Sequence, residues 1–112
     1  MTEEIINIDK EIIKAFHQMW DTFPGMARLI RRDFMIIAAN PIARESGFSE
    51  GVKCINVGVR ELHKGCRSAL MMKSKIGQLD RPEAGKVRGW LPVEGFDDIY
   101  VHFTLFVPEI NK

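Results

Sequence analysis

The spacing of apolar residues near the start of the chain predicts an amphipathic helix over residues 3–20. Apolar side chains recur there at intervals of three and four, as they do on one face of an α-helix. A second apolar line, which includes Ile13 and Trp20, widens the stripe, so one side could pack on the domain and the other on a partner chain. We therefore expect a homodimer with an interface on this helix, formed by Ile5, Ile8, Ile12, Phe16 and Met19.

Two apolar segments after this helix predict a β-hairpin. Residues 26–31 alternate between apolar and basic side chains, and residues 34–39 are more continuously apolar. Arg32 and Asp33 lie between the two segments and suit a tight turn. The hairpin follows Pro24-Gly25, a turn pair that ends the first helix.

Punctuating residues then predict a short helix and a longer one. Asn40 suits an N-cap, Pro41 suits the first helical position, and Gly47 suits a left-handed stop. Helical spacing returns from about residue 62 to residue 76, and the following "GQLDRPEAG" reads as a loop.

The end of the chain predicts two further strands, residues 86–93 and 98–107. Both faces of the last strand are largely apolar, so we expect both to be covered. Strands at both ends of the chain around a helical middle indicate an α+β domain with an antiparallel sheet. We divide the chain into a flanking, dimerising helix over residues 1–22 and a domain over residues 23–112.

Composition limits the partners that this domain can have. With 112 residues and a net charge of +1, the chain has no global attraction to nucleic acid. No run of apolar residues is long enough to span a membrane, and acids occupy the start where a secretion signal carries bases. We expect a cytoplasmic protein without membrane contacts, in which the two cysteines are free thiols.

The segment "RLIRRDFMIIAANPIARESGFSEG" resembles the start of a PAS sensor domain. In that family two strands end in an asparagine and lead into a short helix that stops at a glycine, here Asn40 and Gly47. The resemblance implies a PAS-like five-stranded antiparallel sheet with helices on one face, an N-terminal flanking helix, and a pocket between sheet and helices. It implies sensing and signal transduction by shape change, without catalysis. The strand that follows the long helix in the family is not visible in this sequence.

The cysteines and one histidine raise the question of a bound cofactor. Cys54, His63 and Cys66 offer three ligands, whereas a structural zinc site needs four. PAS sensors that bind haem carry an axial histidine on the long helix, and His63 is the histidine nearest to it. A disulfide switch between the cysteines would need their Cα atoms within about 7 Å. The sequence does not identify a cofactor, and we expect haem or none. The alternative function is a haem- or metal-binding redox or gas sensor that uses His63, with or without Cys66 and Cys54.

The preferred interpretation is a non-catalytic sensor that binds a small molecule or a signalling protein. A small enzyme is the remaining alternative, but no acid–base pair is visible in the pocket strands. Trp90 suits a pocket wall because its indole N–H offers a polar handle. The predicted pocket residues are Ile36, Ala38, Cys54, Leu62, Cys66, Leu70, Trp90, Phe103 and Leu105.

Overall fold

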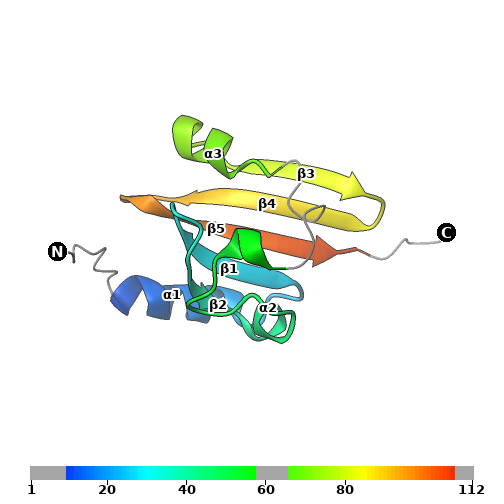
Figure 1. The fold of residues 1–112 in the computed structure, drawn as a ribbon, viewed down its shortest axis with the longest axis horizontal. Helices are drawn as coiled ribbons and strands as arrows, with labels where there is room; N and C mark the ends of the chain where they lie inside the picture. Colours follow the sequence, from blue (N-terminus) through cyan, green and yellow to red (C-terminus); the bar gives the residue numbers. More distant parts are fainter. Residues whose placement is uncertain (1–9, 58–65, 108–112) are drawn as a thin grey trace.

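A five-stranded antiparallel sheet forms the centre of the molecule in a computed structural model that describes residues 10–57 and 66–107. The strand order is β2-β1-β5-β4-β3 (Figure 1). The strands are β1 (Met26–Arg31), β2 (Ile36–Ala39), β3 (Gln78–Glu83), β4 (Lys86–Val93) and β5 (Phe96–Phe106). The helices are α1 (Lys10–Trp20), α2 (Pro41–Glu45), the short 3-10 turn η1 (Cys54–Asn56) and α3 (Ser68–Ser74).

Helices lie against both faces of this sheet, because each strand turns alternate side chains to opposite sides. On the face that we call inner, α2, η1 and α3 contribute to a buried cluster that includes Ile30, Trp90 and Tyr100. On the outer face, α1 packs over β1 and β2, and Phe16 joins a second cluster with Leu29. The predicted fold class, an antiparallel sheet with helices on one face and a flanking N-terminal helix, is therefore confirmed.

Asn40 joins the elements at one end of the sheet. Its Oδ1 accepts hydrogen bonds of 3.0 Å from the backbone N–H groups of Ala27 and Ala43, and the second of these caps α2. Its Nδ2 donates to the carbonyl oxygens of Trp20, at the end of α1, and Gly25. The predicted N-cap and the first helical Pro41 are both present. The side chain is fully buried, so it fixes the positions of α1, β1 and α2 relative to one another.

An aromatic cluster attaches the end of α1 to the outer face. Trp20 and Phe23 both contact the ring of Phe103, with centroid distances of 6.1 and 5.6 Å. A Cβ atom at Gly89 would overlap this ring, so a glycine in β4 leaves the space that the ring occupies. In the described part of the chain, no helix is long and apolar enough to cross a membrane.

The prediction of a loop over "GQLDRPEAG" is wrong, because β3 occupies most of it. Gln78 lies opposite Trp90, and Asp80 lies opposite Arg88 in β4. The strand is at the edge of the sheet and most of its residues are exposed, so it needs no apolar alternation. Pro82 is tolerated there, because an edge strand leaves one row of N–H groups without a partner strand.

The predicted long helix is shorter than expected. Cys66 and Arg67 precede α3, which begins at Ser68 and ends where Lys75 adopts a left-handed backbone with φ of 60°. Only Ser68 and Met71 are buried in this helix, so little apolar contact supports a longer one. Leu62 and His63 lie outside the described residues.

Candidate functional site

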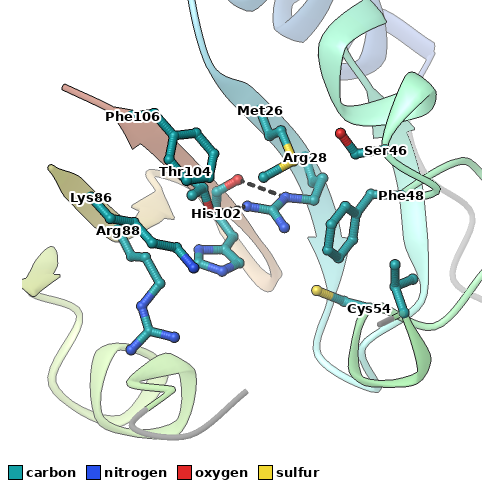
Figure 2. Close-up of a pocket in the computed structure, with 11 residues that line it drawn as sticks. Met26, Arg28, Ser46, Phe48, Cys54, Lys86, Arg88, His102, Thr104 and Phe106 are labelled. Carbon is teal, nitrogen blue, oxygen red and sulfur yellow. Dashed lines mark hydrogen bonds between the residues drawn. The ribbon is translucent and has the colours of Figure 1, made fainter. Parts of the chain in front are cut away.

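A pocket of about 260 Å³ opens on the inner face, between the sheet and the segment that contains α2 and η1 (Figure 2). The side chains around it combine apolar walls with basic groups. The lining residues are Met26, Arg28, Ser46, Phe48, Cys54, Val57, Lys86, Arg88, His102, Thr104 and Phe106. Among the residues that the structure describes, the lining includes no aspartate or glutamate.

Arg28 lies at the base of the pocket and is only 2% exposed. Its Nη2 donates a hydrogen bond of 2.9 Å to Thr104 Oγ1, and its Nε donates to the carbonyl oxygen of His102 at 3.3 Å. The guanidinium also lies over the ring of Phe48, 4.5 Å from the centroid. Burial lowers the pKa of Arg28 from its ordinary value, because the charged form loses hydration. Within residues 10–57 and 66–107, no carboxylate lies within ion-pair distance of it.

Arg88 is the second buried arginine of the inner face, and it has a carboxylate partner. Its Nε and Nη2 donate hydrogen bonds of 2.9 and 2.6 Å to the two oxygens of Asp80 on β3. This is the two-point geometry that a guanidinium forms with a carboxylate. In Figure 2 the Arg88 guanidinium points away from Arg28, so its charge is directed to the edge of the sheet.

His102 lies on β5, between the two strands that carry the arginines, β1 and β4. Its Nδ1 lies 2.8 Å from the carbonyl oxygen of Gly89, which can only accept, so this nitrogen carries the hydrogen. The ring stacks on Trp90 with a centroid distance of 4.8 Å and an interplanar angle of 10°. These two contacts fix the orientation of the imidazole within the pocket wall.

Cys54 forms part of the opposite wall and is 6% exposed. Burial raises the pKa of its thiol, and the attraction of Arg28 only partly offsets this. Burial likewise raises the pKa of Tyr100, on the same face. Both groups are therefore neutral at physiological pH and do not balance the charge of Arg28.

The structure brings together some of the predicted pocket residues and separates others. Cys54 lines the pocket, and Ile36 and Trp90 lie in the buried cluster of the same face. Trp90 is fully buried, and its indole N–H has no acceptor among the described residues. The structure does not bring Ala38 and Phe103 to this pocket, because both point to the outer face.

The remaining predicted residues lie elsewhere. Leu105 follows Phe103 by two positions and therefore shares the outer face. Leu70 is 52% exposed on α3, Cys66 is exposed before it, and neither lines the pocket. Leu62 lies outside the described residues.

Among the described lining residues, sequence reasoning named Cys54 and missed the polar ones as well as the apolar Met26, Phe48, Val57 and Phe106. Arg28 on β1 and His102 and Thr104 on β5 point inward, and the alternation of these two strands was the signal that could have found them. A search for apolar side chains favoured Phe103 and Leu105, the residues between and beside them. An isolated arginine in a strand carries no motif that reveals its burial.

The cofactor hypothesis gains no ligand set from the described residues. Within them, no group of three histidine, cysteine, aspartate or glutamate side chains could hold a metal ion. Both Cys54 and Cys66 are free thiols, as expected. His63 lies outside the described residues, so its role as an axial ligand stays a prediction.

Comparison with known proteins gives a structural match. The sequence matches no family model and no curated protein. A crystal structure of a sensory box sensor histidine kinase from Vibrio cholerae superposes with a TM-score of 0.64, covering 95% of this chain and 100% of that chain. The chain has a PAS-like fold. At 10% identity, the likeness concerns the architecture and not the side chains of the pocket.

This match confirms the resemblance to PAS domains that the sequence carries around Asn40 and Gly47. In this PAS-like domain the punctuating residues serve local geometry: Asn40 caps α2, and Gly47 has a φ of 96° after it. Such positions constrain the backbone and leave the pocket lining unconstrained. The chemistry of the pocket must therefore be argued from its own residues.

Proposed function

We propose that this PAS-like domain is a non-catalytic sensor, which binds a small molecule in the inner-face pocket and transmits the change to α1. The observation that carries this proposal is the placement of pocket and helix on opposite faces of the same strands. His102 and Thr104 line the pocket, whereas Phe103 between them packs against Trp20 and Phe23 beside α1. A ligand that shifts β5 by a fraction of an ångström would act on both faces.

Asn40 supports a second connection between pocket and helix. It caps α2, the helix that leads through Ser46 to Phe48 in the pocket wall. It also donates to the carbonyl oxygen of Trp20 at the end of α1. A movement of α2 on ligand binding would therefore pull on this part-buried hydrogen bond to α1, because the buried Asn40 side chain keeps its partners.

The surface around α1 suits the partner that reads such a change, and we propose a second copy of this chain. Met19 is 72% exposed, and Ile12 is half-buried. An apolar groove of about 230 Å³ runs between the helix and the uncovered part of the outer face, where Leu91 and Val93 lie. Phe16 differs from Ile12 and Met19, because the sheet already buries it. Two further predicted interface residues, Ile5 and Ile8, lie outside the described residues.

A ligand screen with an occluded control tests the sensor function. A panel of small acids, bases and neutral molecules is added to the full chain, and the melting temperature is measured. Ser46→Trp closes the rim of the pocket, and Ser49→Trp, which adds the same bulk outside the lining, is the matched control. We expect at least one compound to raise the melting temperature of the wild-type and Ser49→Trp proteins and not of Ser46→Trp. Binding by all three proteins, or by none, would refute a sensor that uses this pocket.

Transmission is tested separately with a bound compound. Hydrogen–deuterium exchange is measured with and without it, and the peptides of α1 and β5 are compared with those of β3. We expect slower exchange in β5 and a change in α1. Slower exchange confined to the pocket residues would support ligand binding but refute the proposed transmission from the pocket to α1.

A further inference from the structure

The charge of the pocket distinguishes it from the other buried polar sites of the domain. Arg28 is buried among Thr104 Oγ1, the His102 carbonyl oxygen and the ring of Phe48, all of which are uncharged. An isolated charge is costly to bury unless a counter-charge accompanies it. The cost is removed when a negatively charged group occupies the pocket.

The guanidinium has donors that face such a group. It carries five N–H donors: Nε and one Nη2 hydrogen are used in the hydrogen bonds to His102 and Thr104, and the neutral Cys54 thiol is a further neighbour. Among the described residues, no oxygen acceptor engages Nη1. A planar guanidinium with donors to spare matches the two oxygens of a carboxylate.

A second cation stands on the far side of the pocket. Lys86 is half-buried at the start of β4, and its Nζ lies 5.7 Å from the ring centroid of Phe106. Within the described part of the chain, no carboxylate lies within ion-pair distance of Lys86. Figure 2 shows Lys86 and His102 on one side of Arg28, with Phe48 and Cys54 on the other. An anion between these groups would meet positive charge from two directions.

The walls of the pocket are apolar, which limits the kind of anion. Met26, Phe48, Val57 and Phe106 surround the basic groups. Inorganic phosphate or sulfate would make no apolar contact with these walls, whereas a ligand with an apolar body would remove their surface from water. The volume of about 260 Å³ is below the usual range for ligand pockets, about 300–1,000 Å³. The occupant is therefore small.

We propose that the pocket binds a small organic carboxylate, whose charged group pairs with Arg28 and whose apolar or aromatic body lies against Phe48 and Met26. This inference rests on the proposed sensory function and names the class of ligand for that site. Arg28 is then the specificity-determining residue, and Lys86 contributes a second, half-exposed charge. The ligand supplies to Arg28 the counter-charge that Asp80 supplies to Arg88.

Pairs of compounds that differ only in charge test the proposal. Benzoate, phenylacetate and hexanoate are titrated into the full chain by calorimetry, beside their amides and beside inorganic phosphate. We expect at least one carboxylate to bind about 10- to 100-fold more tightly than its amide. The reason is that a hydrogen bond between the guanidinium and a charged carboxylate stabilises the complex more than one to a neutral amide. Phosphate should bind more weakly than this carboxylate.

Variants of Arg28 then assign the preference to one side chain. Arg28→Met should remove the preference for the carboxylate over the amide. Arg28→Lys should keep this preference but bind the carboxylate more weakly, because lysine retains the charge and lacks the planar pair of donors of the guanidinium. The matched control is Arg31→Gln, on the same strand but outside the pocket, which should bind as the wild type does. The melting temperature of unliganded Arg28→Met shows that the variant is folded.

The outcomes separate this proposal from the sensory function on which it rests. Amides that bind as tightly as carboxylates, or tight binding by Arg28→Met, would overturn the carboxylate proposal and leave a ligand-binding pocket. If no carboxylate binds, the proposal also fails, and the broader compound panel decides whether the sensor survives. Phosphate as the tightest ligand would overturn the organic part of the proposal.

Discussion

Two arginines of the inner face lie on strands separated only by β5, and they meet burial in different ways. Arg88 is buried with Asp80, which accepts two hydrogen bonds from its guanidinium. Arg28 is buried with a hydroxyl, a carbonyl group and an aromatic ring. Arg88 completes an ion pair with Asp80, whereas Arg28 lines a cavity and has no counter-charge among the described residues. Among the described residues no carboxylate accompanies Arg28, and this difference from Arg88 is the basis for proposing Arg28 as the ligand-binding position.

The largest effect is expected when the complete pair is broken. Arg88→Met leaves Asp80, whose side chain is 13% exposed, without its counter-charge and should lower the free energy of unfolding by about 3 kcal/mol. Urea unfolding followed by tryptophan fluorescence measures this. Arg81→Met is the matched control, because it removes an exposed arginine from the neighbouring strand and should change stability little. A stable Arg88→Met would show that the pair is not structural.

The opposite sign is expected at the incomplete site. Arg28→Met removes a buried charge that has no carboxylate partner in the described part of the chain, and it keeps a similar volume, so unliganded protein should become more stable, by about 1–2 kcal/mol. The same urea unfolding experiment applies. A loss of stability as large as that of Arg88→Met would mean that Arg28 is held for structure, and the contrast between the two arginines would disappear.

A carboxylate placed beside Arg28 should make it resemble Arg88. Thr104 Oγ1 is 2.9 Å from Nη2, so Thr104→Asp introduces the counter-charge within the chain. We expect stability to change by at most about 1 kcal/mol, since burial of the new charge and its attraction to Arg28 largely cancel.

Binding is the more telling measurement for this variant. The preference for benzoate over benzamide should disappear in Thr104→Asp, because the position of the ligand carboxylate is taken. Thr104→Val removes the hydroxyl without adding charge and should retain the preference. Equal binding by Thr104→Asp and the wild type would place the ligand away from Arg28.

Much of the fold could be predicted from the sequence because its signals are local. Asn40, Pro41 and Gly47 act through their own backbone positions, and the structure has α2 where they predict it. The two strands of the first hairpin follow from apolar patterning in the same way. The edge strand β3 was missed, because its stability comes from hydrogen bonds to β4 and not from its own apolar residues.

The pocket could be predicted less well, because it depends on which residues are neighbours in space. Arg28 and Arg88 look alike in the sequence, and only the register of β3 and β4 brings Asp80 to one of them. The bulk of Phe103 favoured it as a pocket residue, although the rotation of β5 turns it to α1. The direction of a strand's faces is a global property that no short motif contains.

A third arginine, Arg31 at the end of β1, provides the smallest expected effect and the limit of the comparison. Its guanidinium donates two hydrogen bonds to Asp33, of 2.8 and 2.6 Å, but the Asp33 side chain is 44% exposed. The hydrogen bond from Arg31 lowers the pKa of Asp33 from 3.8 to about 2. The pair therefore stabilises the folded state at pH values above 3.8, the ordinary pKa of the aspartate, and this contribution is lost as the pH falls towards about 2.

Solvent screening keeps the contribution of this exposed pair small. Asp33→Asn should lower the free energy of unfolding by about 0.5 kcal/mol at neutral pH and by less near pH 2, where Asp33 of the wild type also becomes protonated. Urea unfolding of both proteins at the two pH values measures the difference. A loss of stability comparable with that of Arg88→Met would show that hydrogen-bond geometry alone decides how much such a pair stabilises the protein. A small loss would show that burial decides it. The same dependence on burial is the reason why the charge of Arg28 should favour an anionic ligand.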